Sequence, residues 1–473
     1  MTSRTSGASG DCVSWRIARH VTSFRPDDIP PEVARRTKLS LLDQLGVCLA
    51  ASGLGDLIGP FLYLARSAGD GPATILGHSF TAPAPAAAFA NGAMAHALDF
   101  EDTHDETLVH PYAAVFPAAL AVAEELRASG RDFLTAVLVG ADLSCRIARA
   151  FRVDPEKAGR FSLLPMIGAF GATAAVARLL SLTPGQTIQA FATSMSRTTV
   201  SSAYKRYELS HFRAVRDAFN AEAAITAGTL ARHGFEMFDR PFEGPDGYFP
   251  LLAGGQYDPE TLVDDLGSRF ENVDTSFKIW PCCRGTHAFV EAALELAREP
   301  GVSPDAIRAI EVEVPHRFAS LCEPREMRIA PRSAPAAKFS IPFTTAAALT
   351  RGRVTLVEFG PEALHDTQIL RLASLVRCKI RDDAGASSEL EGAVRIELDD
   401  GRRLDSRVHR PRGHVENPVT EEEIREKFFS CAAAAAVPLG EETIAAVVRA
   451  VERLEELDSI DALTSLLRVN PTR

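Results

Sequence analysis

Apolar positions recur every three or four residues through most of the first 270 residues, the spacing of helices with a buried face. The pattern predicts helices over 113–126, 133–150, 169–182 and 219–234, and one that begins after the Pro-containing turn at 27–31. The many Gly and Ala residues of 169–182 allow neighbouring helices to approach closely. Thr183 to Gln186 has the pattern of a capping box that starts a further helix.

The pattern changes near residue 300, where apolar and polar positions begin to alternate. This alternation predicts half-exposed strands at 310–314 and 394–398. Asp400-Gly401 is a strong hairpin turn, and 404–408 continues the return strand. Helical spacing at 343–350 and 362–375 lies between these strands. We therefore expect a smaller α+β domain over 276–410.

Helical spacing returns after the predicted strands. Thr420 to Glu423 is a capping box for a helix that runs to about 437, and 441–457 and 459–467 are amphipathic. We expect these helices to rejoin the first part of the chain. The predicted fold class is mainly α, with a large all-α domain formed by 1–275 and 411–473 and the smaller α+β domain between them.

The net charge of −11 argues against a nucleic-acid partner or a membrane surface. If the ligand is an anion, the site must supply its own cations. The eight cysteines include no CxxC pair, which favours reduced thiols in a cytosol-like compartment. Met1 to His20 has no apolar signal-peptide core, and no run of about 18 apolar residues predicts a membrane span. We expect a cytoplasmic protein.

Residues 91–111 hold the densest group of ionisable side chains in an otherwise apolar region. Five carboxylates fall within eight residues, and three histidines flank or interrupt them: Asp99, Glu101, Asp102, Asp105 and Glu106, with His96, His104 and His110. One interpretation is a solvated loop between core helices, and another is a cleft in which carboxylates tune a proton-transferring histidine. A metal site is the third, although the spacing matches neither HExxH nor an EF-hand loop.

Three other segments could bind anions. Lys278 and Arg284 lie in 277–287, near the predicted domain boundary, and could grip carboxylates. Four cations precede the helix at 219–234, namely Lys205, Arg206, Arg213 and Arg216. The alternative for both segments is an ordinary basic surface. Lys338 begins 338–343, where we expect a buried corner with Lys338 itself at the surface. No GxGxxG, P-loop or nucleophile elbow is present.

Together these segments resemble the MmgE/PrpD, or 2-methylcitrate dehydratase, family over nearly the whole chain. The matching blocks are 91–102, His110-Pro111, 168–172, 231–235, 242–244, 277–287 and 338–342. Members include 2-methylcitrate dehydratases, cis-aconitate decarboxylases and iminodisuccinate epimerases. The resemblance implies a metal-free homodimer without a cofactor, acting on small di- or tricarboxylates. It also implies an all-α domain and a smaller α+β domain with the site between them.

The resemblance also assigns roles to single residues. Asp99, Thr103, His110, Lys278 and Cys283 match site positions of the decarboxylase branch. That branch has histidines where this chain has Ser162 and Cys283, and a substrate-binding lysine where it has Arg213 or Arg216. We therefore expect catalysis by His110, Asp99 and Lys278. The expected substrate-binding residues are Thr103, Arg213, Arg216, Ser162, Cys283 and His287.

The predicted activity is a metal-independent, dehydratase-type lyase that removes a proton next to a carboxylate, with 2-methylcitrate as an example substrate. Such a reaction needs a base within reach of the proton and cations at the carboxylate that accepts the charge. The alternatives are a decarboxylase of cis-aconitate type, an epimerase of amino- or imino-polycarboxylates, and a non-catalytic relative that binds a carboxylate.

Overall fold

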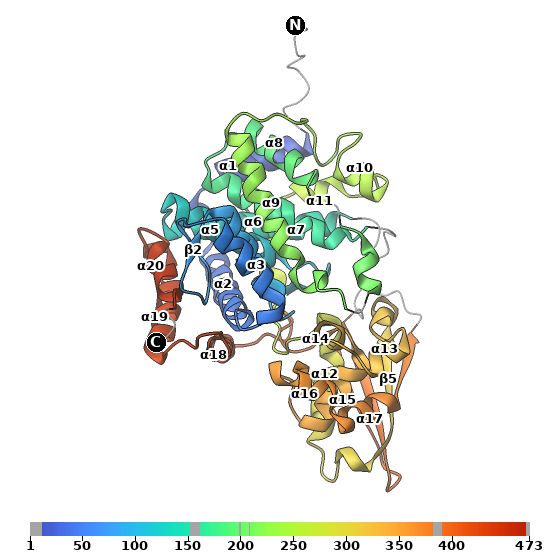
Figure 1. Cartoon of the computed structure of the whole chain (residues 1–473). Helices are drawn as coiled ribbons and strands as arrows, with labels where there is room; N and C mark the ends of the chain where they lie inside the picture. Colours follow the sequence, from blue (N-terminus) through green and yellow to red (C-terminus); the bar gives the residue numbers. More distant parts are fainter. Residues whose placement is uncertain (1–11, 152–160, 198–199, 208, 382–389, 470–473) are drawn as a thin grey trace.

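Helices bury one another in the first half of the chain, as the spacing of apolar residues predicts. The computed structural model describes residues 12–151, 161–197, 200–207, 209–381 and 390–469. Helices α4, α5, α7 and α9 pack against one another at the centre of this part (Figure 1). The helices of this part are α1 (Val13–Ser23), α2 (Pro31–Ala51), α3 (Gly55–Ser67), α4 (Ala84–His96), α5 (Pro111–Leu126), α6 (Gly130–Ala150), α7 (Leu163–Leu179), α8 (Pro184–Met195), α9 (Phe212–Arg232), α10 (Tyr248–Ala253) and α11 (Pro259–Val263), and a short pair of strands, β1 (Ala73–Thr74) and β2 (Thr81–Ala82), lies beside them.

The predicted helices are confirmed, with shifts at their ends. Helix α9 starts at Phe212, earlier than expected, because Ala214 and Val215 continue its buried face. Helix α4 is absent from the sequence prediction. Almost all of its side chains are small and buried, so no polar face marks it as an amphipathic helix.

Small residues let helices α6 and α7 approach closely, as the composition of 169–182 predicts. A Cβ atom added at Gly171 would lie only 2.5 Å from the backbone oxygen of Gly140 and 2.0 Å from Ser144 Oγ. At the start of α8, the Thr183 side chain accepts from the Gln186 amide and the Gln186 side chain accepts from the Thr183 amide. The predicted capping box is therefore confirmed.

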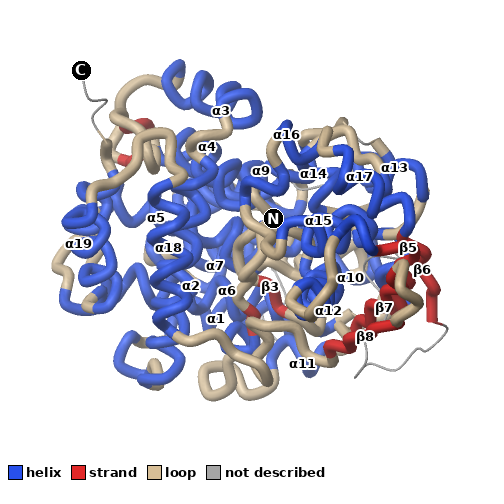
Figure 2. The backbone as a smooth tube through the Cα atoms, turned by 90° about the horizontal axis from the view of Figure 1, so that it is seen from below, coloured by secondary structure: helices blue, strands red, loops and turns tan. Residues whose placement is uncertain are grey.

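A four-stranded sheet forms the β part of the second core, which gathers buried residues from Trp280 to Val408. The strand order is β6-β5-β7-β8, in which β5 and β6 are parallel and the other neighbours are antiparallel. Figure 2 shows this sheet at the edge of the molecule away from α2 and α19. The strands are β5 (Ile307–Pro315), β6 (Val376–Arg381), β7 (Gly392–Leu398) and β8 (Arg403–Val408).

The predicted strands and the Asp400-Gly401 hairpin are confirmed. Strand β6 is absent from the prediction although 376–381 alternates apolar and basic residues, because the helical spacing of 362–375 predicts that the element ends there. The predicted helix at 362–375 is interrupted, since Asp366 caps a new helix by accepting from the Gln368 and Ile369 amides. The helices of this part are α12 (His287–Ala297), α13 (Arg325–Ile329), α14 (Ala334–Lys338), α15 (Ile341–Arg351), α16 (Pro361–Leu364) and α17 (Thr367–Leu375). Of these, α12, α15 and α17 contact the sheet.

The C-terminal helices return to the beginning of the chain. Helices α18 (Glu421–Ala433) and α19 (Glu441–Glu452) contact α2, and their buried side chains belong to the same core as those of α2 (Figure 1). The capping box at Thr420 is confirmed, although α18 ends at Ala433 rather than near 437. A short helix, α20 (Asp461–Thr464), follows. The exact limits of the two expected domains stay a prediction.

Two short strands join the two parts of the molecule. Strand β3 (Thr103–His104) lies in residues 91–111, the acidic segment, and β4 (Thr275–Ser276) leads into the α+β part. They pair antiparallel, with Thr103 opposite Ser276 and His104 opposite Thr275. This pairing brings residues 99–110 next to residues 277–287.

No single helix within the described ranges is long and apolar enough to cross a membrane. Only α2 and α3 taken together meet that test by length and composition, and they meet at a bend of 100°.

We expect Gly171→Ala to lower the thermal unfolding midpoint, because the added methyl group collides with the α6 backbone. Overpacking of this kind costs about 1–3 kcal/mol. The matched control is Gly185→Ala, whose added carbon would lie 3.9 Å from its nearest neighbour, Trp15. A calorimetric scan of both variants checks this, and equal midpoints would contradict the close packing of α6 and α7.

Candidate active site

A cavity of about 410 Å³ lies where the acidic segment, the start of α9 and the α+β part meet. Asp99, Thr103 and His110 line it from the acidic segment, and Arg213 and Arg216 line it from α9. Cys283 and residues 316–321 line it from the α+β part. The structure therefore unites three segments that the sequence analysis singles out separately.

The wall of this cavity is strongly basic. Six cations and one carboxylate, Asp99, are among its described lining residues; the cations are Lys205, Arg213, Arg216, Arg284, Arg317 and Arg328. Such an excess of positive charge favours a ligand with more than one carboxylate. It supplies the local cations that an acidic protein needs in order to bind an anion.

His110 lies directly before α5, at the end of the acidic segment, and one of its two ring nitrogens is hydrogen-bonded within the protein. Nδ1 lies 3.0 Å from the backbone oxygen of Asp102 and 2.8 Å from Glu101 Oε1. These two nearer partners can only accept hydrogen bonds, and the Thr103 hydroxyl lies farther away at 3.4 Å, so Nδ1 carries a hydrogen and Nε2 carries the lone pair in the neutral ring. No hydrogen bond to Nε2 is found within the described part of the chain. Nε2 is thus the atom available for proton transfer.

Glu101 lies beneath two histidines. It is fully buried, and its Oε1 contacts the Nδ1 atoms of both His96 and His110. Burial alone raises the pKa of this carboxyl, but the positive charges of His96, Lys278 and His110 outweigh burial and hold the pKa well below its ordinary value. Glu101 is therefore not part of a solvated loop, and its ionised carboxylate orients His110 from behind the cavity wall.

Burial and the neighbouring Lys278 ammonium lower the pKa of His110, although Glu101 opposes this. The unliganded ring is therefore neutral at pH 7. An anionic ligand beside it would favour the protonated ring, since it adds negative charge next to the imidazole.

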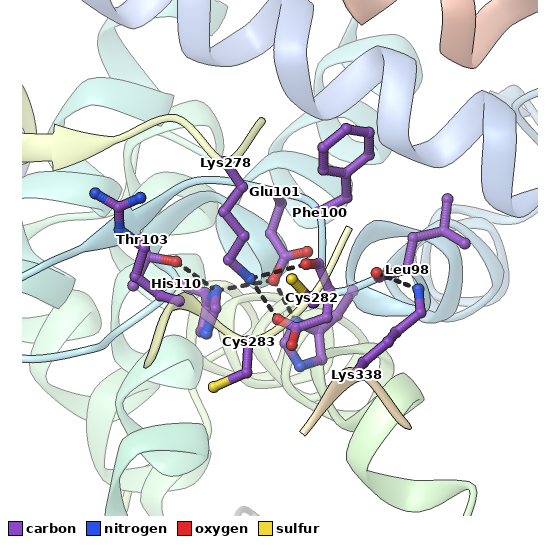
Figure 3. Close-up of polar contacts among 12 residues, drawn as sticks. Leu98, Phe100, Glu101, Thr103, His110, Lys278, Cys282, Cys283 and Lys338 are labelled. Atoms are coloured by element: carbon purple, nitrogen blue, oxygen red, sulfur yellow. Dashed lines mark hydrogen bonds and ion pairs between the residues drawn. The ribbon is translucent and has the colours of Figure 1, made fainter. Parts of the chain in front are cut away.

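Asp99 and Lys278 form a buried ion pair at the cavity wall. Lys278 Nζ donates to Asp99 Oδ1 and, over 3.0 Å, to the Asp99 backbone oxygen (Figure 3). Asp99 adopts a left-handed backbone conformation with φ of 49°, which Asp tolerates better than most residues. Burial raises the pKa of Asp99, but the positive charges around it, chiefly that of Lys278, together have the larger opposite effect, so the pKa of Asp99 lies below its ordinary value. Asp99 lines the cavity, whereas Lys278 is not among its lining residues.

Lys338 is buried, contrary to the expectation that it lies at the surface. Its ammonium donates to the backbone oxygen of Leu98, and its own backbone oxygen accepts from the Cys283 amide over 3.0 Å (Figure 3). The lysine thus connects the residue before Asp99 with the segment that holds Cys283. Burial lowers the pKa of Lys338 to about 8, although the charge of Asp99 opposes this.

The side chains of Arg284 and His287 are bonded to other residues of the protein and are therefore not both open to an anionic ligand. Arg284 donates to both oxygens of Asp105, over 2.8 and 2.9 Å. His287 is buried between Arg284 and the Cys282 backbone oxygen, each 3.2 Å from a ring nitrogen. Burial and the charge of Arg284 bring the pKa of His287 well below its ordinary value. His287 is not among the lining residues, which places it behind the predicted substrate-binding surface.

Arg213 and Arg216 project from the first turn of α9 toward the acidic segment. Arg213 stacks on the Phe339 ring at 4.1 Å and lies 5.3 Å from the Tyr204 ring centroid. Arg216 lies 3.5 Å from Asp217. No carboxylate within the described ranges lies within ion-pair distance of Arg213, so its charge is available to a ligand.

Ser162 is buried next to this cationic wall. Its hydroxyl is 2.9 Å from the Tyr204 hydroxyl, and it is not among the cavity-lining residues. The structure therefore places Ser162 behind the surface it is predicted to form, with Tyr204 between it and the lining residue Arg213.

Four side chains of the acidic segment also have the composition of a metal site. One ligand atom each from His96, Asp99, Glu101 and His110 lies within 4.8 Å of the others. Lys278 already neutralises Asp99, and Glu101 already accepts from both histidines. A divalent ion would have to displace that ammonium and those ring protons, so this donor set does not favour a metal.

The predicted site residues thus fall into two groups. Asp99, Thr103, His110, Arg213, Arg216 and Cys283 line one cavity, whereas Lys278, Ser162 and His287 lie behind it. The sequence does not reveal the roles of Glu101 and Lys338. The family block at 338–342 is the signal that could have identified Lys338.

We expect the Cys283 thiol to alkylate slowly even though it lines the cavity. Burial and the nearby Asp99 charge raise its pKa to about 12, which makes its thiolate fraction about a thousand-fold smaller than that of an ordinary cysteine. Iodoacetamide labelling at pH 8 followed by peptide mass spectrometry checks this. The denatured protein is the internal control, and equal rates in both states would contradict the assignment.

Comparison with known proteins gives the same family for both parts of the chain. Residues 15–260 match the MmgE/PrpD N-terminal domain, and residues 280–453 match the MmgE/PrpD C-terminal domain.

Curated relatives are similar over almost their whole length. A cis-aconitate decarboxylase-like protein, oryM, of Aspergillus oryzae is 28% identical, covering 96% of this chain and 97% of that protein. The cis-aconitate decarboxylase of Mus musculus is 27% identical, covering 96% and 93%, and that of Aspergillus terreus is 25% identical, covering 95% of each. The chain therefore belongs to the MmgE/PrpD family.

Proposed function

We propose that this protein is a lyase that removes CO₂ from a small unsaturated tricarboxylate of the cis-aconitate class. The observation that carries the proposal is the open Nε2 of His110 in a cavity with six cations on its wall. The relatives named as cis-aconitate decarboxylases support this alternative over the dehydratase that the sequence analysis puts first.

In the proposed reaction the carbon–carbon bond to one carboxylate breaks and CO₂ leaves. The electron pair of that bond moves into the allylic system next to the remaining carboxylates, where a proton is then added. Arg213 and Arg216 stabilise the charge that develops on those carboxylates. His110 delivers the proton from Nε2, and Glu101 stabilises the imidazolium through Nδ1.

The side chains behind the wall hold these groups in place. Lys278 keeps Asp99 ionised and fixed, so that Asp99 presents one negative charge beside His110. We propose that no metal takes part, because the candidate donors are already paired with Lys278 and with one another. Full activity after exhaustive EDTA treatment and gel filtration is expected, whereas loss that a divalent metal restores would contradict this.

Product analysis decides between the candidate reactions. Incubation with cis-aconitate in D₂O is expected to release CO₂ and give a product with one new C–D bond, detected by NMR and mass spectrometry. Loss of water from 2-methylcitrate with no turnover of cis-aconitate would instead establish the dehydratase. Proton exchange with loss of configuration in an amino- or imino-polycarboxylate would establish the epimerase.

Replacing His110 by alanine is expected to lower kcat about 10²–10⁴-fold, the usual contribution of a positioned acid–base group. Thermal unfolding serves to show that the variant is folded. The matched control is His409→Ala, since 71% of the His409 side chain is exposed on the α+β part. If the His110 variant kept nearly full turnover, the assignment of His110 as the acid would be wrong.

The pH profile tests the direction of proton transfer. If His110 is the acid, the free enzyme needs it protonated, and burial beside Lys278 lowers its pKa from the ordinary 6.5. The value of kcat/KM is therefore expected to begin falling at a pH below 6.5, as His110 loses its proton, and to go on falling at higher pH. A base would give the opposite slope, with kcat/KM rising to a plateau, and that result would exclude the decarboxylation mechanism.

A further inference from the structure

Lys427 reaches the back of the site from the opposite end of the chain. It belongs to α18, and only 8% of its side chain is exposed. Its ammonium donates to the backbone oxygen of Phe100 over 2.6 Å and to that of Lys278 over 2.9 Å. It also forms an ion pair with Asp43 of α2.

Three partners surround the Lys427 ammonium. It donates hydrogen bonds to the backbone oxygens of Phe100 and Lys278, and the Asp43 carboxylate balances its charge as an ion pair. The Phe100 ring lies 3.8 Å from Nζ and adds a cation–π contact. A buried charge is costly unless its partners are well placed, so these contacts constrain the position of Lys427 relative to both loops.

The two backbone oxygens belong to the loops that carry the proposed chemistry. Phe100 stands between Asp99, which lines the cavity, and Glu101, which contacts His110. Lys278 is the partner of Asp99. One ammonium therefore holds the main chain of Lys278 and of Phe100, the residue next to Asp99. The adjacent β3–β4 ladder holds the same loops over only two residue pairs.

We propose that Lys427 is a positioning residue, which sets the relative placement of the Asp99 and Lys278 loops and thereby the alignment of His110. The proposal rests on the proposed function only for its kinetic consequence. Lys427 is not among the lining residues of the cavity, so it acts through the loops and does not contact substrate.

The main test compares the wild type with the double variant Asp43→Asn/Lys427→Met. Removing both charges avoids leaving a buried carboxylate alone, which would destabilise the fold for an unrelated reason. We expect kcat to fall about 10–100-fold, since a shift of about 1 Å in a catalytic group can cost that much, with KM changed less than about threefold. Unchanged kcat in a folded double variant would overturn the proposal.

A matched lysine separates positioning from general stability. Lys38 of α2 also donates to a backbone oxygen, that of Glu452 over 2.8 Å, and pairs with Glu455 over 3.0 Å. Within the described residues, its hydrogen bonds and ion pair go to Glu452 and Glu455 and not to the cavity loops. We expect Lys38→Met to lower the thermal unfolding midpoint slightly, because this ion pair is partly exposed, with kcat unchanged. A parallel fall in kcat would show that the effect of Lys427 is only loss of stability.

A crystal structure of the double variant tests the proposal without any assay. We expect the backbone at Phe100 and Lys278 to move apart and the Asp99–Lys278 ion pair to lengthen or break. Loops that keep their positions would overturn the positioning role, whatever the substrate is. If the wild type fails to act on cis-aconitate, the proposed function fails, while this comparison still decides the role of Lys427.

Discussion

Neutralisation of buried carboxylates by lysines from distant parts of the chain is the constraint on which the site depends. Asp43, Asp99 and Glu101 are buried within the helical part, where an unpaired charge costs several kcal/mol. Lys278 comes from the segment before the α+β part, and Lys427 comes from the C-terminal helix α18. The acidic loop can therefore be stable only when both later segments have folded against it.

The order of the elements along the chain brings both lysines to the buried carboxylates. The α+β part is inserted between α11 and α18, and the chain then returns so that α18 packs on α2 beside the site. Asp102 shows what happens without a cation of its own. Burial, together with the charges of Asp43 and Glu101, raises the pKa of Asp102 well above its ordinary value. A raised pKa favours the neutral form of this carboxyl, which lowers the cost of burying it.

The site has two electrostatic layers with different tasks. Behind the wall, each ionised carboxylate has a matched cation or histidine, so this layer is rigid and nearly neutral. In front, the arginines of α9 and of the α+β part exceed the single carboxylate of the cavity wall. Fixed charges of this kind stabilise developing negative charge without reorganising during the reaction. The neutral layer keeps its own carboxylates from repelling an anionic ligand.

Local pattern was sufficient for much of the fold and for part of the site. Apolar periodicity predicted most long helices, alternation predicted β5, β7 and β8, and side-chain spacing predicted the caps at Thr183 and Thr420. These features depend on neighbours within a few residues, so a single sequence contains the necessary information. The roles of Asp99, His110 and Cys283 came instead from the family resemblance, because the local pattern left the acidic loop open to a solvated or a catalytic interpretation.

Only the tertiary structure decided which charges are buried and paired. Glu101 and Glu106 look alike in the sequence, yet Glu101 is enclosed beneath two histidines while Glu106 is exposed. Lys427 resembles any helix-surface lysine until α18 docks on α2. The cost of burying a charge depends on partners hundreds of residues away, and a local pattern holds no information about them. The sequence by itself therefore determined most long helices and three of the four strands of the sheet, and its family resemblance indicated residues of the cavity wall. The fold determined the ion pairs behind that wall, because their partners meet only in the tertiary structure.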